Sequence, residues 1–399
     1  MSIRIAFTLI GGKKWTGGYN YLRNLLATVE RHQPGHITPI LMVGQDVEPA
    51  ELAPFRQLEN CEIVTDPVFD TERQKALQLH QLILGGHPAV LALLRTHRID
   101  LVFESAFFFG WRTQLPAIAW IPDLQHRYLP HLFGRLSRLK RELGFRIQIG
   151  SGRAVMVSSE DTRQVCEHIY PGCSGAVHAV RFAVQAPRFI PDDEARAVAD
   201  RYGLPEQYLL MPNQFWAHKN HRLVVHALAK LRDQGREIVV CATGSQLDPR
   251  NPAFGPALLE EVRDLRLTDL FRTPGLIPYP DLAPLMQASM ALLNPSLFEG
   301  WSTTVEEART AGVPMVLSDL AVHREQAGEQ ATYFDRTSVD SLAETLAAVR
   351  PLPADERRTR RAHARIDSER RVERFAADFV RLVEATRTSY GRENQGKRP

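Results

Sequence analysis

The sequence predicts an α/β protein made of two Rossmann-like, doubly wound domains. Two apolar stretches, Ser2 to Ile10 and Tyr208 to Met211, indicate strands, and each is followed by a polar loop and an amphipathic helix. A strand, a loop and a helix in this order form the first unit of a Rossmann-like half. Across residues 183–207, prolines and an acidic cluster replace the apolar runs, and we place the domain boundary there.

The composition is typical of a globular protein. With 399 residues, of which 44% are apolar and 24% charged, the chain is long enough for two cores. No apolar run approaches the length of a bilayer and the start lacks a leader pattern, so we expect a cytoplasmic protein. The net charge is only +3, and acidic residues alternate with the C-terminal arginines, so no nucleic-acid partner is expected. None of the four cysteines belongs to a C-x-x-C pair, which argues against a metal site or a disulfide framework: Cys61, Cys166, Cys173 and Cys241.

The most informative stretch runs from Asn294 to Glu325. It follows an apolar strand and opens with a loop, after which Thr303 and Glu306 predict a capping box at the start of a short helix. Gly312 predicts the C-terminal cap of that helix, Pro314 prevents its continuation, and the next apolar run predicts another strand. The loop and the helix N-terminus would then lie at the carboxyl edge of a parallel sheet, where α/β folds bind ligands.

Two carboxylates mark this edge, Glu299 in the loop and Glu307 in the first turns of the helix. The backbone N–H groups of residues 300–304 are expected to face the same space, and a helix N-terminus behind a glycine suits a phosphate. Carboxylates accept hydrogen bonds from neutral hydroxyls, such as the diols of a sugar. A phosphate site beside a polyol site predicts a sugar nucleotide as the ligand. The alternative is a capped helix with two solvated acids.

The run FEGWSTTVEEARTAGVPMVLSDLAVHRE resembles the E-x7-E segment of the retaining glycosyltransferases of family 4, which have the two-domain GT-B fold. The spacing alone is a weak pattern, and the surrounding Pro-Ser-x-x-Glu-Gly, Glu-Ala-x-x-x-Gly-x-Pro and Ser-Asp make it specific. The resemblance implies that Glu299 binds hydroxyls of the transferred sugar and that Glu307 binds the ribose diol. It also implies an acceptor domain (1–185) and a donor domain (186–375), with the C-terminal helix (about 376–399) crossing back onto the first.

The resemblance also covers the loop PNQFWAHKNH, where the family usually carries Arg-x4-Lys on the donor diphosphate. Here Gln214 replaces the Arg and Lys219 keeps the Lys, so phosphate binding should be weaker unless Arg324 or another residue substitutes. The alternative for Lys219 is an ordinary surface lysine. The resemblance implies further donor contacts in four places. They are two early glycines (Gly17 and Gly18, whose alternative role is a tight turn without ligand), a turn after the next strand (Gly244), and backbone atoms near the nucleotide base (Leu276 and Ile277). The last is the start of the E-x7-E helix: Gly300, Trp301, Ser302 and Thr303.

A second polar group follows the strand that ends at Pro122. Asp123 and His126 come directly after it, at another carboxyl edge, and family members often have a Pro-Asp-x-x-His segment facing the cleft. Either residue would orient the acceptor hydroxyl or the donor sugar in a catalytic role. The alternative is that Asp123 only caps the next helix and that His126 is a surface residue.

Residues 132–149 predict an amphipathic helix with a leucine stripe and basic flanks. Two interpretations stay open. The helix packs on its own sheet with a solvated basic face, or it lies on anionic lipid at the inner membrane.

Taken with the resemblance, these residues predict a metal-independent, retaining hexosyltransferase that uses a nucleoside-diphosphate sugar. No Asp-x-Asp motif is present to hold a metal, so Lys219 and the helix dipole would stabilise the leaving diphosphate, and no cofactor is expected. The family implies a glycan or lipid-linked glycan acceptor in bacterial surface polysaccharide or lipopolysaccharide synthesis. The alternatives are a sugar-nucleotide epimerase or a glycan phosphorylase of the same fold, and a non-catalytic sugar-nucleotide binding protein.

Overall fold

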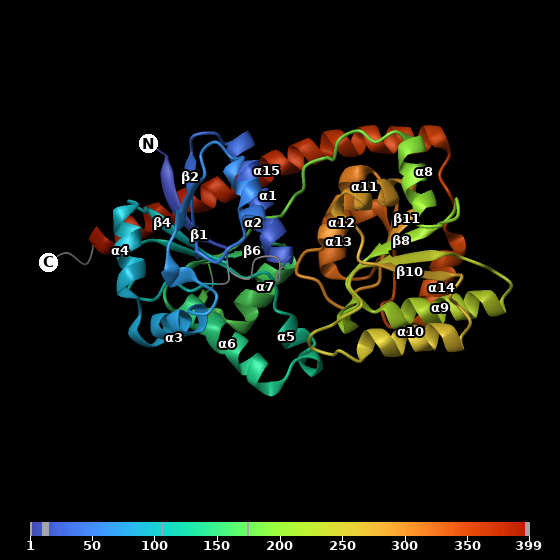
Figure 1. Cartoon of the computed structure of the whole chain (residues 1–399), viewed down its shortest axis with the longest axis horizontal. Coiled ribbons are helices and arrows are strands. Elements are labelled where there is room, and N and C mark those ends of the chain that lie inside the picture. Colours follow the sequence, from blue (N-terminus) through green and yellow to red (C-terminus); the bar gives the residue numbers. More distant parts are fainter. Residues whose placement is uncertain (1, 10–15, 106, 174, 396–399) are drawn as a thin grey trace. The chain divides into compact units, whose positions relative to one another are not determined.

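The computed structural model describes residues 2–9, 16–105, 107–173 and 175–395, and it divides the chain into two compact units (Figure 1). Unit 1 consists of residues 1–122, 139–182 and 371–399. Unit 2 consists of residues 123–138 and 183–370. The segment 123–138, which the sequence division assigned to the first domain, therefore groups with unit 2. Residues 396–399 of the expected C-terminal helix lie outside the described residues.

Unit 1 is a seven-stranded parallel sheet in the order β3-β2-β1-β4-β5-β6-β7. Its strands are β1 (Ile3–Thr8), β2 (Ile37–Val43), β3 (Glu62–Thr65), β4 (Leu101–Glu104), β5 (Ala117–Trp120), β6 (Ala154–Val157) and β7 (Val177–Ala179). Its helices are α1 (Thr16–His32), α2 (Pro49–Arg56), α3 (Gln74–Leu84), α4 (Pro88–Thr96), α6 (Arg135–Gly150, which begins in the 123–138 segment) and α7 (Glu160–Ile169), with 3-10 turns η2 (Pro67–Phe69) and η4 (Pro171–Cys173).

Unit 2 is a six-stranded parallel sheet in the order β10-β9-β8-β11-β12-β13. Its strands are β8 (Leu209–Pro212), β9 (Val240–Thr243), β10 (Phe271–Gly275), β11 (Ala291–Asn294), β12 (Met315–Ser318) and β13 (Ala331–Phe334). Its helices are α5 (Gln125–Tyr128), α8 (Asp192–Arg201), α9 (His221–Asp233), α10 (Phe254–Asp264), α11 (Tyr279–Ala288), α12 (Thr303–Ala311), α13 (Ala321–Ala327) and α14 (Val339–Ala348), with 3-10 turns η3 (Pro130–Leu132), η5 (Ala217–Lys219) and η6 (Gly328–Gln330).

Both sheets are doubly wound, which confirms the predicted fold class. In unit 2, Leu209 and Met211 pack into one core with α9, α10 and α14, whereas Leu210 packs into another with α8, α11 and α12. This alternation follows from the two-residue period of a strand that is covered on both faces. In unit 1, one face buries α3 and α4, and the other carries aromatic contacts such as Phe103 against Phe379, whose ring centroids lie 5.8 Å apart.

The last helix, α15 (Ala354–Gln395), is one continuous helix that contributes to both units. Its first part belongs to unit 2, where Arg361 pairs with Asp192. Its second part belongs to unit 1 through Phe375 and Phe379, both fully buried. Apolar residues at helical spacing on this second half account for its packing.

In each sheet the strand order reverses beside the first strand, between β1 and β4 in unit 1 and between β8 and β11 in unit 2. Loops that leave two such strands run to opposite faces of the sheet, which opens a crevice at their carboxyl ends. Doubly wound proteins bind ligands at this switch point. In unit 2, the loops after β8 and β11 are the two that carry Lys219 and Glu299.

Among the described residues, no single helix is long and apolar enough to cross a membrane. Within these residues, only α3 and α4 taken together reach that length and apolarity, and they are bent by 91° relative to each other.

Candidate functional site

The loops after β8 and β11 meet through an ion pair. The Lys219 ammonium donates to Glu299 Oε1 over 2.6 Å, and the two side chains are only 14% and 9% exposed. Lys219 is therefore not an ordinary surface lysine, because its charge is held beside a nearly buried carboxylate. The sequence predicted both residues for the site, and the structure brings them together.

Glu299 is held by its own loop as well as by Lys219. The Ser296 hydroxyl lies 2.7 Å from Glu299 Oε1 and 2.7 Å from Asn294 Oδ1. The Ser296 carbonyl in turn accepts a hydrogen bond from the Ser318 hydroxyl at the end of β12, also over 2.7 Å. The loop is thereby fixed to two adjacent strands, and the Glu299 carboxylate is positioned before any ligand arrives.

Lys219 is presented by a turn that is tied to the same loop. The following residue, Asn220, has φ of 59°, in the left-handed region that Asn tolerates better than most residues, and begins α9. Its side-chain amide donates to the carbonyls of Pro295 (3.2 Å) and Arg336 (3.0 Å). The Leu297 N–H donates to the His218 carbonyl over 2.8 Å, so the two loops are connected by backbone as well as by side chains.

The start of α12 differs from the sequence prediction. The N-cap is Ser302, whose carbonyl accepts from the Glu306 N–H, so the predicted capping box of Thr303 and Glu306 is wrong. The Ser302 hydroxyl accepts from the Asn294 side chain (2.9 Å), and its backbone N–H and carbonyl are both bonded to the Gln326 amide at 3.0 Å. Its N–H is thus already used, whereas an α-helix leaves its first N–H groups without intrahelical acceptors. The predicted C-terminal glycine cap is confirmed, since Gly312 has φ of 69°.

Glu307 lies one turn into α12 and is partly buried. Burial raises the pKa of its carboxyl to about 7, and the hydrogen bond from the Tyr279 hydroxyl at the start of α11 opposes this shift. Near neutral pH this group is therefore divided between an acceptor-only carboxylate and a protonated acid. The partner that the structure gives Glu307 is thus Tyr279 and not Glu299.

Two of the predicted donor residues have structural roles of their own. The Gln214 side chain accepts a hydrogen bond from the Ser245 N–H over 2.7 Å, which joins the loop after β8 to the loop after β9. Gly244 has φ of 125°, and a Cβ there would lie 2.7 Å from the Asn213 carbonyl, so only glycine fits. Beyond β10, Leu276 is 74% exposed, and Ile277 packs partly against the core.

The segment after β5 provides a turn and a buried histidine. Asp123 accepts from the Gln125 N–H over 2.9 Å, in a turn just before α5, whose N-cap is Leu124 and not Asp123. His126 is only 2% exposed, so the interpretation as a surface residue is wrong. The Gln125 side chain accepts from Arg250 over 3.1 Å, and Arg250 also lies 3.3 Å from His218 Nδ1.

Arg250 and His218 were not identified from the sequence. Arg250 lies in the loop after β9 and stacks over the rings of Trp216 and Phe133, at 5.1 and 5.4 Å from their centroids. His218 precedes Lys219 and is buried; burial, followed by the charges of Lys219 and Arg250, holds its pKa well below the usual value. A neutral His218 ring can therefore accept from Arg250 beside Lys219. An arginine in a polar loop carries no local pattern that would have identified it.

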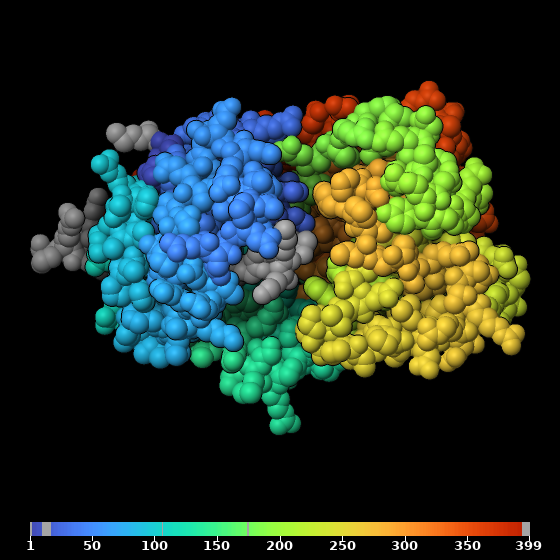
Figure 2. Space-filling view, viewed as in Figure 1, coloured from blue at the N-terminus to red at the C-terminus, as the bar shows by residue number. Residues whose placement is uncertain are grey.

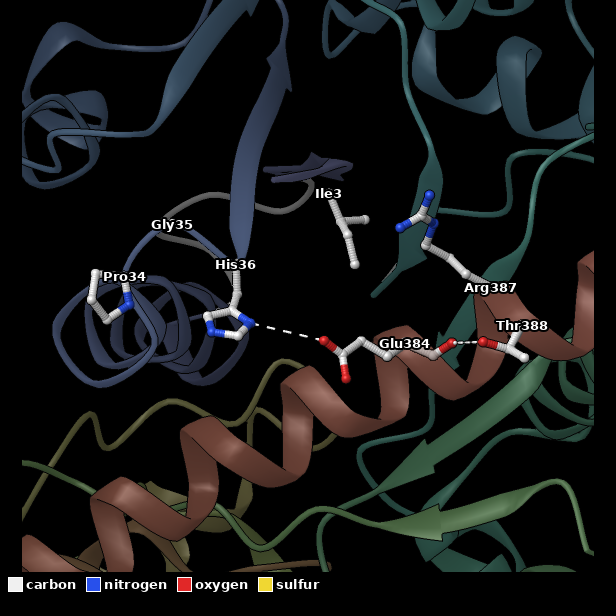
Figure 3. A pocket seen from close by; sticks show the side chains of 7 residues that line it. All are labelled: Ile3, Pro34, Gly35, His36, Glu384, Arg387 and Thr388. Atoms are coloured by element: carbon white, nitrogen blue, oxygen red, sulfur yellow. Dashed lines mark hydrogen bonds and ion pairs between the residues drawn. The ribbon is translucent and has the colours of Figure 1, made fainter. Parts of the chain in front are cut away.

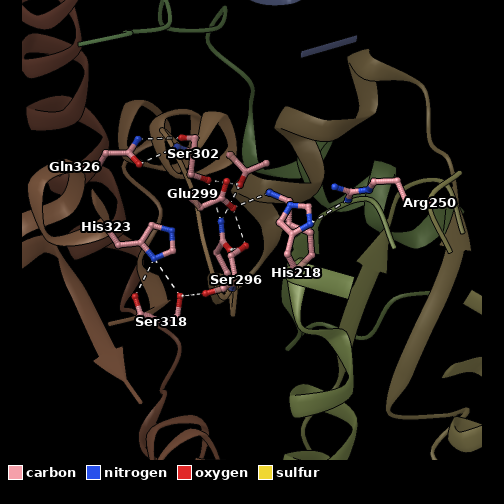
Figure 4. A network of polar contacts seen from close by, with 11 residues as sticks. His218, Arg250, Ser296, Glu299, Ser302, Ser318, His323 and Gln326 are labelled. Carbon is pink, nitrogen blue, oxygen red and sulfur yellow. Dashed lines mark hydrogen bonds and ion pairs between the residues drawn. The ribbon is translucent and has the colours of Figure 1, made fainter. Parts of the chain in front are cut away.

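His323, at the start of α13, is a further buried neighbour. Its Nδ1 lies 2.8 Å from the Ser318 carbonyl, and burial lowers its pKa, while the nearby Glu299 charge opposes this shift. Its Nε2 has no hydrogen-bond partner in the described part of the chain. His323 therefore belongs to the same polar network as the ion pair (Figure 4).

The early glycines lie in unit 1. Gly17 and Gly18 occupy the first turn of α1, with Gly17 exposed and Gly18 buried, and the residues just before them (10–15) lie outside the described part. Unit 1 also has a surface pocket of about 680 Å³, lined by Ile3, His36, Glu384 and Arg387 among others, with His36 3.8 Å from Glu384 (Figure 3). It lies where β1 and β2 begin, at the edge opposite the one where doubly wound sheets bind ligands.

Across the described residues, no group of three or more His, Cys, Asp and Glu side chains is arranged to hold a metal ion.

Comparison with known proteins finds relatives for a large part of unit 2. Residues 199–365 match the family model described as glycosyl transferases group 1. The chain is 25% identical over 148 residues to the O-antigen chain mannosyltransferase RfbU of Salmonella typhimurium, covering 37% of this chain and 40% of that protein. It is 29% identical over 186 residues to the D-inositol 3-phosphate glycosyltransferase of Frankia alni, covering 44% of each. The matches thus span less than half the length of these relatives.

Solved structures extend the likeness of the fold to nearly the whole chain. Anabaena Alr3699/HepE, crystallised with UDP and glucose, superposes with a TM-score of 0.69 at 14% identity, covering 96% of this chain and 100% of that one. WaaG, a glycosyltransferase involved in lipopolysaccharide biosynthesis, has a TM-score of 0.62 at 16% identity, covering 92% and 95%. The chain thus has the GT-B fold, and its stretch 199–365, which holds Lys219, Glu299 and Glu307, matches the model of the group 1 glycosyltransferases.

Proposed function

We propose that this protein is a retaining, metal-independent glycosyltransferase that moves a hexose-type sugar from a nucleoside-diphosphate sugar to a glycan or lipid-linked glycan. The observation that carries the proposal is the Lys219–Glu299 pair at the switch point of unit 2, next to the N-terminus of α12. A cation, a carboxylate and a helix N-terminus together match a diphosphate bound to a polyol.

Donor binding is an exchange of partners in this proposal. The diphosphate accepts from Lys219 and from the first N–H groups of α12, and a sugar hydroxyl donates to Glu299 in place of the ammonium. Neither charge is left uncompensated in the bound state, which matters because an unpaired charge in a nearly buried site is costly. Glu307 accepts from the ribose diol in its ionised form.

Bond cleavage leaves negative charge on the departing nucleoside diphosphate. Lys219 and the α12 dipole are fixed before the reaction and stabilise that charge, so the proposed mechanism needs no metal. Glu299 keeps the sugar oriented while the acceptor hydroxyl attacks from the same face that the diphosphate leaves, which gives retention. Asp123 and His126, placed in unit 2 by the segment 123–138, are proposed to orient the acceptor or the sugar.

The acceptor is proposed from the relatives. RfbU is named as an O-antigen chain mannosyltransferase and WaaG as an enzyme of lipopolysaccharide biosynthesis, so we propose a bacterial surface glycan or its lipid-linked precursor. Such a substrate would bring a cytoplasmic enzyme to the inner face of the inner membrane.

A thermal-shift screen with UDP-, GDP-, ADP- and dTDP-sugars tests the donor site. A donor present at 100 times its Kd would stabilise the protein by about 2.7 kcal/mol. We expect one donor to give this shift, Glu307→Gln to weaken its binding, and Glu299→Gln mainly to slow its turnover. Glu329→Gln changes an exposed carboxylate outside the site and is the control.

Three results would contradict the proposal. Donor binding that is the same in all three variants would remove the site assignment. Tight donor binding without any hydrolysis or transfer would favour the non-catalytic alternative. Loss of transfer after EDTA treatment, restored by a divalent cation, would overturn the metal-independent mechanism.

A further inference from the structure

Helix α6 exposes its leucines to solvent. Leu136, Leu139 and Leu143 are 75%, 64% and 53% exposed, and none of the 16 residues of α6 is buried. Their spacing places them on one face, as in the stripe that an amphipathic helix normally turns toward the core. Of the two interpretations that the sequence left open, packing of this stripe on the sheet is therefore wrong.

The helix contacts the rest of unit 1 through polar side chains. Gln148, roughly opposite Leu139 around the helix, donates to the buried Glu104 over 3.4 Å. The Tyr170 hydroxyl donates to Glu142 over 3.0 Å, and the guanidinium of Arg146 lies 5.7 Å from the centre of the Tyr170 ring. These contacts to the rest of unit 1 are polar, while Leu136, Leu139 and Leu143 stay exposed (α6 is the green segment at the lower edge of Figure 2).

Basic residues flank the exposed stripe. Helix α6 carries five basic residues and one acid, Glu142, which pairs with Arg146 over 2.7 Å. Arg135 and Lys140 lie on opposite edges of the leucine face, both exposed. A leucine stripe between basic edges matches an anionic bilayer surface, because the leucines reach the acyl boundary while the cations stay among the headgroups.

We propose that α6 docks the protein on an anionic lipid surface. The charge of the flanks selects this occupant over a second copy of the chain, since two α6 helices would bring like charges together. The contact is reversible and depends on salt, as expected for one short helix without a covalent anchor. Vesicle binding needs neither donor nor acceptor, so this inference can fail or hold independently of the proposed chemistry.

Flotation of the full chain with vesicles tests the proposal. We expect binding to vesicles of equal parts phosphatidylglycerol and phosphatidylcholine, and weak binding to phosphatidylcholine alone. The variant R135Q/K140Q should bind about 25-fold more weakly, from about fivefold per basic residue. The variant L139S/L143S should lose about 100-fold, because two leucines no longer enter the interface. All these residues are exposed, so we expect both variants to melt as the parent does.

Matched controls use exposed residues on other elements. R358Q/R370Q removes two exposed charges from α15, and L247S removes a leucine that is 59% exposed in unit 2. Both controls should bind vesicles as the parent does. Equal binding to the neutral vesicles, or equal losses in the controls and the α6 variants, would overturn the proposal. A dimer in solution that L139S/L143S dissociates would also overturn it, because the stripe would then be a protein interface.

Discussion

The Lys219→Met variant tests the ion pair at the switch point most directly. It keeps much of the side-chain volume but removes the cation beside the Glu299 carboxylate, which is only 9% exposed. The Ser296 hydroxyl then remains to donate a hydrogen bond to Glu299. Removal of one member of a buried pair costs about 3 kcal/mol, at the lower end of the known range because Lys219 is 14% exposed. For a unit of this size the melting temperature should fall by about 6–12 °C.

The double variant K219M/E299Q separates the charge from the packing. Without the carboxylate there is no uncompensated charge, so most of the lost stability should return. Donor binding should not return, because the diphosphate still lacks its cation; one charge-assisted hydrogen bond corresponds to roughly a 10- to 150-fold change in affinity. Thermal unfolding and calorimetric titration with the donor measure the two effects separately.

A matched control is available on the surface of the same unit. Lys230 pairs with Asp340 at 2.5 Å, but these side chains are 37% and 71% exposed, so Lys230→Met should change stability by less than about 0.5 kcal/mol. The reasoning fails if K219M is as stable as K230M, or if K219M/E299Q is no more stable than K219M.

Three further predictions concern single positions. Burial raises the folded-state pKa of Glu307 to about 7 from 4.5, so its ionised form destabilises the fold; E307Q should melt above the parent at pH 8, with the gap closing by about pH 4.5. Arg153→Met leaves the buried Glu104, its partner at 3.3 Å, without a counter-charge. The free energy of unfolding measured in urea should fall by about 3–5 kcal/mol, and R153M/E104Q should regain most of it. Gly244→Ala forces a Cβ against the Asn213 carbonyl at φ of 125° and should cost about 1–3 kcal/mol, together with a measurable loss of donor affinity.

The sequence predicts the parts of the fold that depend on local pattern. Alternating or continuous apolar runs identified strands such as Ile37–Val43, and Gly312 marked the end of α12, because the left-handed conformation there favours glycine. Lys219 and Glu299 were also found, from their loops behind predicted strands together with the family resemblance. These inferences needed only neighbouring residues.

Other features depend on contacts between distant residues. Thr303 and Glu306 matched a capping box, yet the N-cap is Ser302, whose backbone N–H and carbonyl are bound by Gln326, 24 residues further along the chain. The role of Arg250 rests on Gln125 and His218, neither of which is near it in sequence. The leucine period of α6 was read correctly, but a period cannot say which side of a helix meets the protein.

The hydroxyl of Ser296 has one hydrogen and two carboxyl- or amide-type oxygens at the same distance, Glu299 Oε1 and Asn294 Oδ1. It can donate to only one of them at a time, and rotation about the Cβ–Oγ bond redirects the hydrogen bond from one acceptor to the other. When a sugar hydroxyl donates to Glu299, the Ser296 hydroxyl can therefore donate to Asn294 instead, without movement of the loop. In a Ser296→Ala variant this hydroxyl is missing, so the loop would have to rearrange when Glu299 changes partner. Comparing the variant with the parent would show how much donor binding depends on the Ser296 hydroxyl.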